Sequence, residues 1–294
     1  MTVILQNAID AISLGALFAL ASLGIGLIFG IMRLINFAHG ELMMFGAYAL
    51  FFLVGQPEAL MVIAAIAFVV VVALGMDRLS FRPLRRAKPA TLLIASFALA
   101  YFLQHLVVLV VGARPKSITF MPGLGGFFVL DELRVPKLQV ITIGVTAVLL
   151  LGLIGFFRRT SLGTQMRAAA DDFRMAQLMG VRANSVIALA FMISGALAAV
   201  VSVLYVAQTG TLSPRMGVNL VLIAFVATVI GGMGSMVGAA LGGVLVGVLT
   251  VVLQAVLAPD LRPYRDAFVF AVLIAVLLVR PEGLMRGRAM RERV

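Results

Sequence analysis

Three polar residues stand close together in an otherwise apolar part of the chain. Asn36, His39 and Glu41 interrupt two apolar runs within the segment 32–48. Polar and ionisable groups in such a place are costly unless they face water, a partner or the protein interior. Gly40 lets the backbone turn between the two runs. The pattern therefore predicts a broken membrane helix that lines a substrate path, with these candidate pathway residues: Asn36, His39, Gly40 and Glu41.

The same residue types allow two other interpretations. A short cytoplasmic hairpin would leave Arg33 and Glu41 merely solvated. A membrane enzyme would need a nucleophile, an acid–base pair or a metal cluster near one interface, and Asn36, His39 and Glu41 are the only remotely suitable set. The order His39-Gly40-Glu41 differs from the H-E-x-x-H zinc motif, which places two histidines one helical turn apart, and the chain has no cysteine. Neither a metal site nor a catalytic residue is predicted.

The composition places these residues in a membrane. Of the 294 residues, 63% are hydrophobic and only 12% are charged, whereas ordinary soluble domains have roughly 25% charged residues. Charge-free apolar runs recur along the chain, each close to the roughly 20 residues that a helix needs to cross a bilayer. No run alternates apolar and polar residues, so helices are the remaining way to satisfy backbone groups in lipid. We exclude a soluble enzyme and predict an all-α polytopic membrane protein.

Nine apolar runs are candidate spans, and together they form a single transmembrane domain over residues 1–294. Two of the runs are short for a crossing, so half-helices are expected there and eight or ten crossings are alternatives to nine. The glycine-rich stretch 231–235 predicts a tight turn between two helices, or else a break inside one buried region. Glycines four residues apart, such as Gly243 and Gly247, predict close helix packing, although glycine is also simply frequent in membrane helices. The runs are 9–31, 42–54, 60–76, 90–111, 138–157, 186–207, 218–233, 236–257 and 267–279, of which 42–54 and 267–279 are the short ones.

Basic residues are concentrated in the segments 77–89, 158–185 and 280–294, which hold 15 of the 23 lysines and arginines. Cytoplasmic loops of membrane proteins are enriched in these residues. Nine crossings place all three segments on the cytoplasmic side, with the C-terminus inside and the N-terminus outside. We therefore attribute the net charge of +11 to the orientation of the chain in the membrane and not to nucleic-acid binding. The long loop 112–137 is then external, and we expect it to form an ordered cap.

No segment of the chain supplies energy for transport. There is no G-x-x-x-x-G-K-[ST] phosphate loop, and no chain of membrane carboxylates of the kind that ion-coupled carriers use. His105 is expected to be a packed helix residue without a role. If transport is active, a partner must hydrolyse ATP, and the natural docking surface is the segment 158–185. Within this segment the residues 164–179 suit one short amphipathic helix that ends at Gly180, which alone could equally lie on anionic lipid.

Three motifs together resemble the inner-membrane permeases of branched-chain amino acid ABC transporters, of the LivH type. The residues 36–41, Asn-Phe-Ala-His-Gly-Glu, look like the signature that follows the first long span of that family. The residues 158–181 look like its cytoplasmic coupling-loop signature, and the turn at 231–239 with the closing residues 280–284 completes the resemblance. The resemblance runs nearly end to end, and the conjunction of motifs is specific although each motif alone is not.

The resemblance implies a heteromeric importer in the bacterial inner membrane. Its other parts would be a second homologous permease subunit, two cytosolic ATPase subunits that bind ATP and Mg, and a periplasmic or extracellular substrate-binding protein. This chain would lie in the lipid bilayer, bind no cofactor and no nucleic acid, and hydrolyse no ATP itself. The segment 163–181 would enter a cleft of the ATPase and pass on its closure, through the coupling residues Gly163, Arg167, Asp171, Asp172, Ala176 and Gly180.

The expected cargo is leucine, isoleucine and valine. Since the family also includes permeases for urea, short amides and other amino acids, a urea or short-amide permease is the alternative within it. Outside the family, a self-sufficient channel or a secondary carrier would move its substrate without an ATPase. Neither of these two explains the conspicuous segment 158–185.

Overall fold

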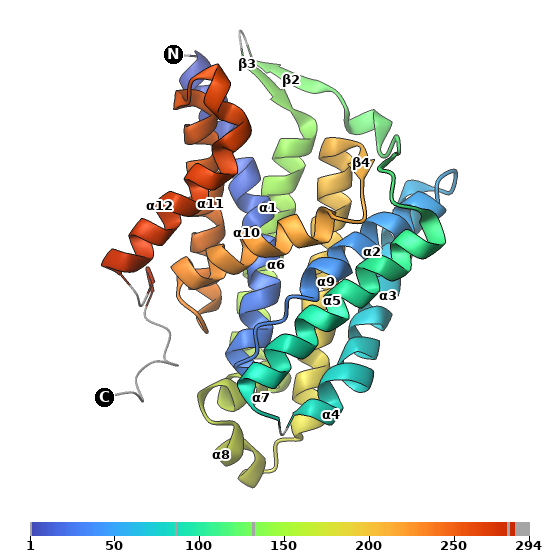
Figure 1. Ribbon diagram of the computed structural model, residues 1–294, viewed down its shortest axis with the longest axis vertical. Helices are drawn as coiled ribbons and strands as arrows, with labels where there is room; N and C mark the ends of the chain where they lie inside the picture. The colour runs from blue at the N-terminus through green and yellow to red at the C-terminus, as the bar shows by residue number, and fades with distance from the viewer. Residues whose placement is uncertain (1, 86, 131–132, 281–282, 286–294) are drawn as a thin grey trace.

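Each of the nine predicted apolar runs forms an α-helix in the computed structural model of the chain (Figure 1). The structure describes residues 2–85, 87–130, 133–280 and 283–285. The all-α prediction is confirmed, since the described strands are short and form only two small two-stranded ribbons. The nine helices are α1 (Thr2–Met32), α2 (His39–Phe52), α3 (Glu58–Met76), α5 (Pro89–Val111), α6 (Lys137–Arg159), α9 (Ala183–Thr209), α10 (Met216–Gly231), α11 (Met236–Val256) and α12 (Arg265–Val279).

Helices α1 and α9 form the centre of the bundle. In α1, 83% of the most apolar window is buried, and in α9 the share is 67%, whereas it is 17% in both α5 and α6. The outer helices therefore turn most of their apolar side chains outward, as lipid-facing helices do. Within the described part of the chain, six helical segments are long and apolar enough to cross a membrane: Ile4–Met32, Glu58–Leu84, Pro89–Val111, Lys137–Arg159, Ala183–Thr209 and Met236–Val256.

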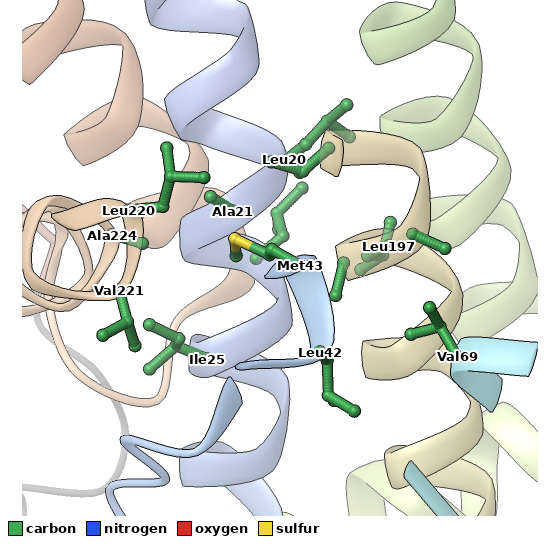
Figure 2. Packing of buried hydrophobic residues seen from close by; sticks show 14 of the residues in the cluster. Leu20, Ala21, Ile25, Leu42, Met43, Val69, Leu197, Leu220, Val221 and Ala224 are labelled. Atoms are coloured by element: carbon green, nitrogen blue, oxygen red, sulfur yellow. The ribbon is translucent and has the colours of Figure 1, made fainter. Parts of the chain in front are cut away.

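Three of the helices are shorter than a full crossing. Helix α2 has 14 residues, α10 has 16 and α12 has 15, fewer than the roughly 20 that a span requires. Figure 2 shows Leu42 and Met43 of α2 surrounded by side chains of α1, α9 and α10. A short helix is tolerated at membrane depth where protein surrounds it. The predicted interrupted helices are thus confirmed, and α2 is the interrupted helix in the core.

Helix α11 packs on α1 through small residues. A methyl group added at Gly243 would collide with the backbone of Ala19, and one added at Gly247 would collide with the backbone of Gly15. The Ser22 hydroxyl lies 2.7 Å from the carbonyl oxygen of Ala239 across the same contact. Close backbone approach of this kind holds membrane helices together without a hydrophobic driving force. For Gly243 and Gly247, the packing interpretation is confirmed.

The stretch 231–235 is a tight turn between α10 and α11, as one of the two alternatives predicts. Gly232 and Gly234 have φ values of 107° and 89°, which L side chains adopt only with strain. The Ser235 hydroxyl accepts a hydrogen bond of 3.0 Å from the Gly238 amide and caps α11. The Leu284 amide donates to the carbonyl oxygen of Ile230 at 2.6 Å, so residues 283–285 dock on this turn. The remainder of the predicted cytoplasmic tail, 281–282 and 286–294, lies outside the described residues.

The basic segments 77–89 and 158–185 meet at one end of the bundle. The Arg85 guanidinium contacts the Asp77 carboxylate at 2.6 Å and also bonds to the Asn184 side chain. Figure 1 shows this end below and the loop 112–137 at the opposite end. That arrangement is the one the charge distribution predicts. The loop contributes three strands to two ribbons, in which β1 (Lys116–Ser117) pairs with β4 (Thr211–Leu212), which follows α9, and β2 (Phe127–Leu130) pairs with β3 (Leu133–Pro136).

The prediction of one amphipathic helix over 164–179 is wrong. The segment forms two helices, α7 (Ser161–Asp171) and α8 (Phe173–Leu178), with an extended backbone at Asp172 between them. The Asp172 carboxylate accepts a 2.9 Å hydrogen bond from the Met175 amide. Asp is a favoured N-cap because it satisfies such free amides, and this local bond starts a new helix.

Gly180 ends α8 as predicted. Its φ is 88°, and its amide donates to the carbonyl oxygen of Gln177 at 3.0 Å. The Val181 amide donates to the carbonyl oxygen of Ala176, also at 3.0 Å. Together these two bonds form a Schellman motif, which favours glycine at the left-handed position.

The α1–α11 contact leads to a stability prediction. We expect Gly243→Ala to lower the free energy of unfolding by about 1–3 kcal/mol, because the added methyl group overpacks a backbone contact. Gly152→Ala on α6 is the matched control, since an added methyl group meets no atom within 4 Å there. Thermal unfolding of the two purified variants in detergent measures the difference. Equal stabilities would contradict the packing assignment.

Candidate functional site

The chain leaves the helical conformation between α1 and α2. Helix α1 ends at Met32, Arg33 has a φ of 54°, and α2 starts at His39. The Asn36 side-chain oxygen accepts a 3.1 Å hydrogen bond from the Ala38 amide, and the His39 amide donates to the Asn36 carbonyl oxygen at 3.2 Å. Asn favours such local bonds to its own backbone. Asn36 thereby determines where α2 begins.

Helix α5 supports the broken segment from the side. The Phe37 amide donates to the Ser96 hydroxyl at 3.4 Å, and the same hydroxyl lies 3.3 Å from the Ile35 carbonyl oxygen. Backbone groups released from a membrane helix must find partners within the protein. Ser96 is such a partner, and its hydrogen bonds hold residues 35–37 against α5.

His39 joins three helices through one buried serine. Its side chain is 0% exposed, and its Nδ1 lies 3.1 Å from the hydroxyl of Ser194 on α9. That hydroxyl is also 3.0 Å from the carbonyl oxygen of Gly24 on α1. Since serine has one proton to donate, donation to Gly24 implies that Nδ1 of His39 carries the ring proton. A methyl group at Gly24 would lie 2.5 Å from the ring, so glycine is required there.

Gly40 is a contact residue and not the point at which the chain turns. The turn precedes it, and Gly40 lies in the first turn of α2. A methyl group at Gly40 would collide with the Gly217 carbonyl group, and one at Gly217 would lie 2.5 Å from the Gly40 carbonyl oxygen. The start of α2 therefore crosses the start of α10 backbone against backbone. The expectation that Gly40 itself provides the bend is wrong.

Glu41 is buried without a hydrogen-bond partner among the described residues. Its side chain is 0% exposed, and neither carboxylate oxygen accepts a bond there. Arg33 is exposed, but the solvated-hairpin alternative is wrong for Glu41. The residue forms part of the wall of a groove of about 520 Å³ between α5 and α10. Burial of an acidic side chain at membrane depth is costly and is typical of a functional position.

The groove is largely aromatic and aliphatic. The Phe37 and Phe97 rings stack in its wall with centroids 4.1 Å apart and an interplanar angle of 19°. Tyr101 and Gln104 line the groove and also line a neighbouring hollow of about 710 Å³. The two hollows therefore adjoin along α5. Other residues of the groove wall are Ile94, Ala98, Val218, Val221 and Leu222.

The neighbouring hollow is more polar. Its lining includes His105, Ser213 and Arg215. The ring of His105 stacks on Tyr101 at a centroid distance of 3.9 Å, and its Nδ1 lies 2.9 Å from the Tyr101 carbonyl oxygen. His105 is exposed. It is hydrogen-bonded to its own helix, but it borders an open hollow, so the expectation that it is packed inside is wrong.

The second predicted set of residues lies on α7 and α8. Gly163 packs so closely on the end of α6 that a methyl group would lie 2.6 Å from the Cα of Phe157. Gly163 and Ala176 are buried, whereas the charged members of the set are exposed. Helix α7 contacts α1, α6 and α9. The segment is thus attached to the core helices on one face and open on the other, where the charged members lie: Arg167, Asp171 and Asp172.

Exposed apolar side chains end this segment. Leu178 is 75% exposed and Met179 is 84% exposed, and they follow Met175, which is 56% exposed. A cluster of this kind at the end of a bundle, outside the membrane spans, marks a contact surface.

The structure brings the sequence candidates into two separate sets. Asn36, His39, Gly40 and Glu41 lie together in the core, and the six residues of the α7–α8 segment lie at one end. No group of three or more His, Cys, Asp or Glu residues that could hold a metal occurs in the part of the chain that the structure describes. Sequence inspection missed the partners of the first set because they come from distant parts of the chain: Gly24, Ser96, Phe97, Ser194 and Gly217.

Comparison with known proteins decides the family. Residues 7–277 match the family described as branched-chain amino acid transport system, permease component. The chain belongs to this family. Within it, the chain is 36% identical to the high-affinity branched-chain amino acid transport system permease protein BraD of Pseudomonas aeruginosa, over 99% of this chain and 98% of BraD. It is 34% identical to LivH of Escherichia coli K12, over 99% of this chain and 97% of LivH.

A solved structure shares the fold of this family member. The match is to a chain of PsaBC from Streptococcus pneumoniae in complex with Fab, with a TM-score of 0.51 and 17% sequence identity. It covers 93% of this chain and 91% of the other. This permease thus has the overall helical arrangement of that protein, and the low identity limits the likeness to the fold.

The buried His39–Ser194 contact leads to a second stability prediction. We expect Ser194→Ala to lower the free energy of unfolding by about 1–3 kcal/mol, because it leaves a buried ring nitrogen without a partner. Ser202→Ala, also buried on α9, is the matched control, since among the described residues the Ser202 hydroxyl donates to the carbonyl oxygen of Ala199 in its own helix and to no other helix. Chemical denaturation of both variants in detergent compares them. A larger loss for Ser202→Ala would contradict the role of Ser194.

Proposed function

We propose that this chain is a membrane-spanning permease subunit of an ABC importer that carries branched-chain amino acids across the bacterial inner membrane. The observation that carries the proposal is the full-length match to BraD and LivH, which are named as branched-chain amino acid permeases. The fold supports it, because the helices surround a buried, interrupted segment with an adjoining groove. Interrupted helices at membrane depth often form the substrate sites of transporters.

The groove between α5 and α10 is the proposed translocation surface of this subunit. Glu41 and Phe37 contribute to its wall directly. Asn36, His39 and Gly40 act by positioning, since they fix the start of α2 against α9 and α10. A second homologous permease subunit would close the open side of the groove. The polar hollow beside it would receive substrate from an external binding protein.

The α7–α8 segment is the proposed ATPase contact. Its buried face rests on α1, α6 and α9, so a force on its exposed face reaches the central helices. Its apolar end, Leu178 and Met179, would enter the ATPase subunit, which would bind ATP and Mg in place of this chain. The basic residues of this end support a cytoplasmic location for it, and the N-terminus of α1 would then lie on the outer side. Two such ATPase subunits would serve the two permeases.

Reconstituted uptake tests the proposed function. The complex that co-purifies with this chain in mild detergent is placed in liposomes with ATP inside and loaded binding protein outside. We expect uptake of labelled leucine that depends on ATP and on the binding protein. Leucine uptake that proceeds without ATP would indicate a channel or carrier instead. Uptake of urea or acetamide in place of leucine would indicate the alternative cargo within the family.

A variant of the α8 end tests the ATPase contact. We expect Leu178→Asp combined with Met179→Asp to reduce co-purification of the ATPase by at least about tenfold, because two charges replace exposed apolar contact area. Phe128→Asp, at the opposite end of the molecule, is the matched control, since Phe128 is an exposed apolar residue as well. Quantitative mass spectrometry of the purified complexes gives the ratio. An unchanged ATPase content in the double variant would remove α8 from the interface.

A further inference from the structure

The polar hollow of about 710 Å³ lies at the end of the bundle opposite to the α7–α8 segment, between α5 and the turn that precedes α10. Tyr101 and Gln104 line both this hollow and the proposed translocation groove, so a molecule in the hollow lies next to the groove. Small-molecule sites in proteins have volumes of roughly 300–1,000 Å³. The polar hollow therefore has the size of a site for a small molecule.

The turn that carries Arg215 is fixed on two sides. The Gln104 side chain donates to the carbonyl oxygen of Pro214 at 3.3 Å and joins the turn to α5. Just before the turn, β4 pairs with β1 of the external loop, with Leu212 opposite Lys116. Pro214 is buried, whereas Arg215 is exposed. The backbone at Arg215 is thus held in place while its side chain stays accessible from the hollow.

The charge around the polar hollow is positive. Arg215 lines it, and no aspartate or glutamate is among the described residues of the lining. Arg114 and Lys116 stand on either side of Pro115, which is another lining residue. Arg215 has no ion pair within the described ranges. On the proposed orientation these basic residues lie outside, where the enrichment of cytoplasmic loops in lysine and arginine does not account for them.

The remaining lining indicates the second part of a ligand. Tyr101, Val108 and Pro115 provide aromatic and aliphatic surface beside the guanidinium group. Arginine binds carboxylates through charge-assisted hydrogen bonds. A cationic group next to an apolar wall is therefore complementary to a small molecule with a carboxylate and an aliphatic chain. Leucine, isoleucine and valine have both parts, whereas urea and short amides have no anionic group.

From this geometry, and resting on the proposed function, we propose that Arg215 binds the carboxylate of the arriving amino acid in the polar hollow, with Tyr101 and Val108 against its aliphatic chain. The polar hollow is the first binding site of the cargo on the outer side, and the adjoining groove receives the cargo from it. Arg215 thus favours cargo that has a carboxylate over uncharged amides.

Two analogues of leucine that differ only in charge test the proposal on the unmodified complex. 4-Methylpentanoate has a carboxylate, and 4-methylpentanamide replaces it with an uncharged amide of the same size. We expect leucine and 4-methylpentanoate to raise the thermal unfolding midpoint of the detergent-purified complex without binding protein, since ligand binding stabilises the folded state. We expect no shift with the amide, or with sodium chloride at equal ionic strength. Equal shifts with acid and amide, or no shift with leucine and the acid, would overturn the proposal.

A charge-neutral variant tests the residue itself. We expect Arg215→Gln to abolish the stabilisation by 4-methylpentanoate and to reduce leucine uptake by about tenfold to a hundredfold, the loss of one charge-assisted hydrogen bond. Arg215→Lys should keep part of the stabilisation, because it keeps the charge and loses the bidentate geometry. Arg134→Gln is the matched control, since Arg134 is an exposed arginine of the external loop outside the hollow lining.

Affinity for the binding protein distinguishes a ligand contact from a protein contact. We expect Arg215→Gln to bind the loaded binding protein as tightly as the unmodified complex does. A weaker association, with the stabilisation by leucine and 4-methylpentanoate unchanged, would assign Arg215 to the contact with the binding protein and overturn the proposal.

The outcomes separate this proposal from the proposed function. If the unmodified complex shows no ATP-dependent leucine uptake, the importer assignment itself fails. If the unmodified complex transports leucine and Arg215→Gln keeps both the stabilisation and the uptake, the importer stands and the role of Arg215 is refuted. If Arg215→Gln does not assemble, Arg215→Lys and the comparison of acid with amide on the unmodified complex still decide.

Discussion

The start of α2 at membrane depth is the constraint on which the rest of the structure depends. A helix that begins inside a membrane exposes free amides and carbonyls, which lipid cannot satisfy. In this chain Asn36 and Ser96 bond to the released backbone groups, and Gly40 brings α2 against the backbone of α10. The close packing of α1, α9 and α10 around α2 follows from that requirement, because only protein can replace the missing water.

The same constraint explains where small residues stand. Gly24 makes room for the His39 ring, and Gly217 makes room for the carbonyl group of Gly40. Farther along the bundle, Gly243 and Gly247 bring α11 onto α1. Because membrane helices gain little from hydrophobic burial against each other, such close contacts carry much of their association energy.

The interrupted segment and the α7–α8 segment are joined by the central helices. His39 is bonded through Ser194 to α9 and α1, and α7 contacts the same two helices. The two segments therefore contact the same pair of central helices.

The sequence by itself determined the fold class and the positions of the helices, and it singled out two candidate segments. Long charge-free runs allow only helices in lipid, glycines mark the turn at 231–235, and clustered arginines mark one end of the bundle. These are local or compositional properties, so they are visible along the chain. The apolar pattern did not predict the division of residues 164–179 into two helices. That division depends on the hydrogen bond by which the Asp172 side chain caps α8.

Only the tertiary structure decided which groups meet. The segment 36–41 is contacted from four other helices, by Gly24, Ser96, Ser194 and Gly217. The spacing of these residues along the sequence does not predict the contacts. The burial of Glu41 could not be read from the sequence either, since a charged residue after a span is equally compatible with a solvated hairpin. Burial depends on which helices surround a residue, and that is a property of the packed bundle rather than of the chain.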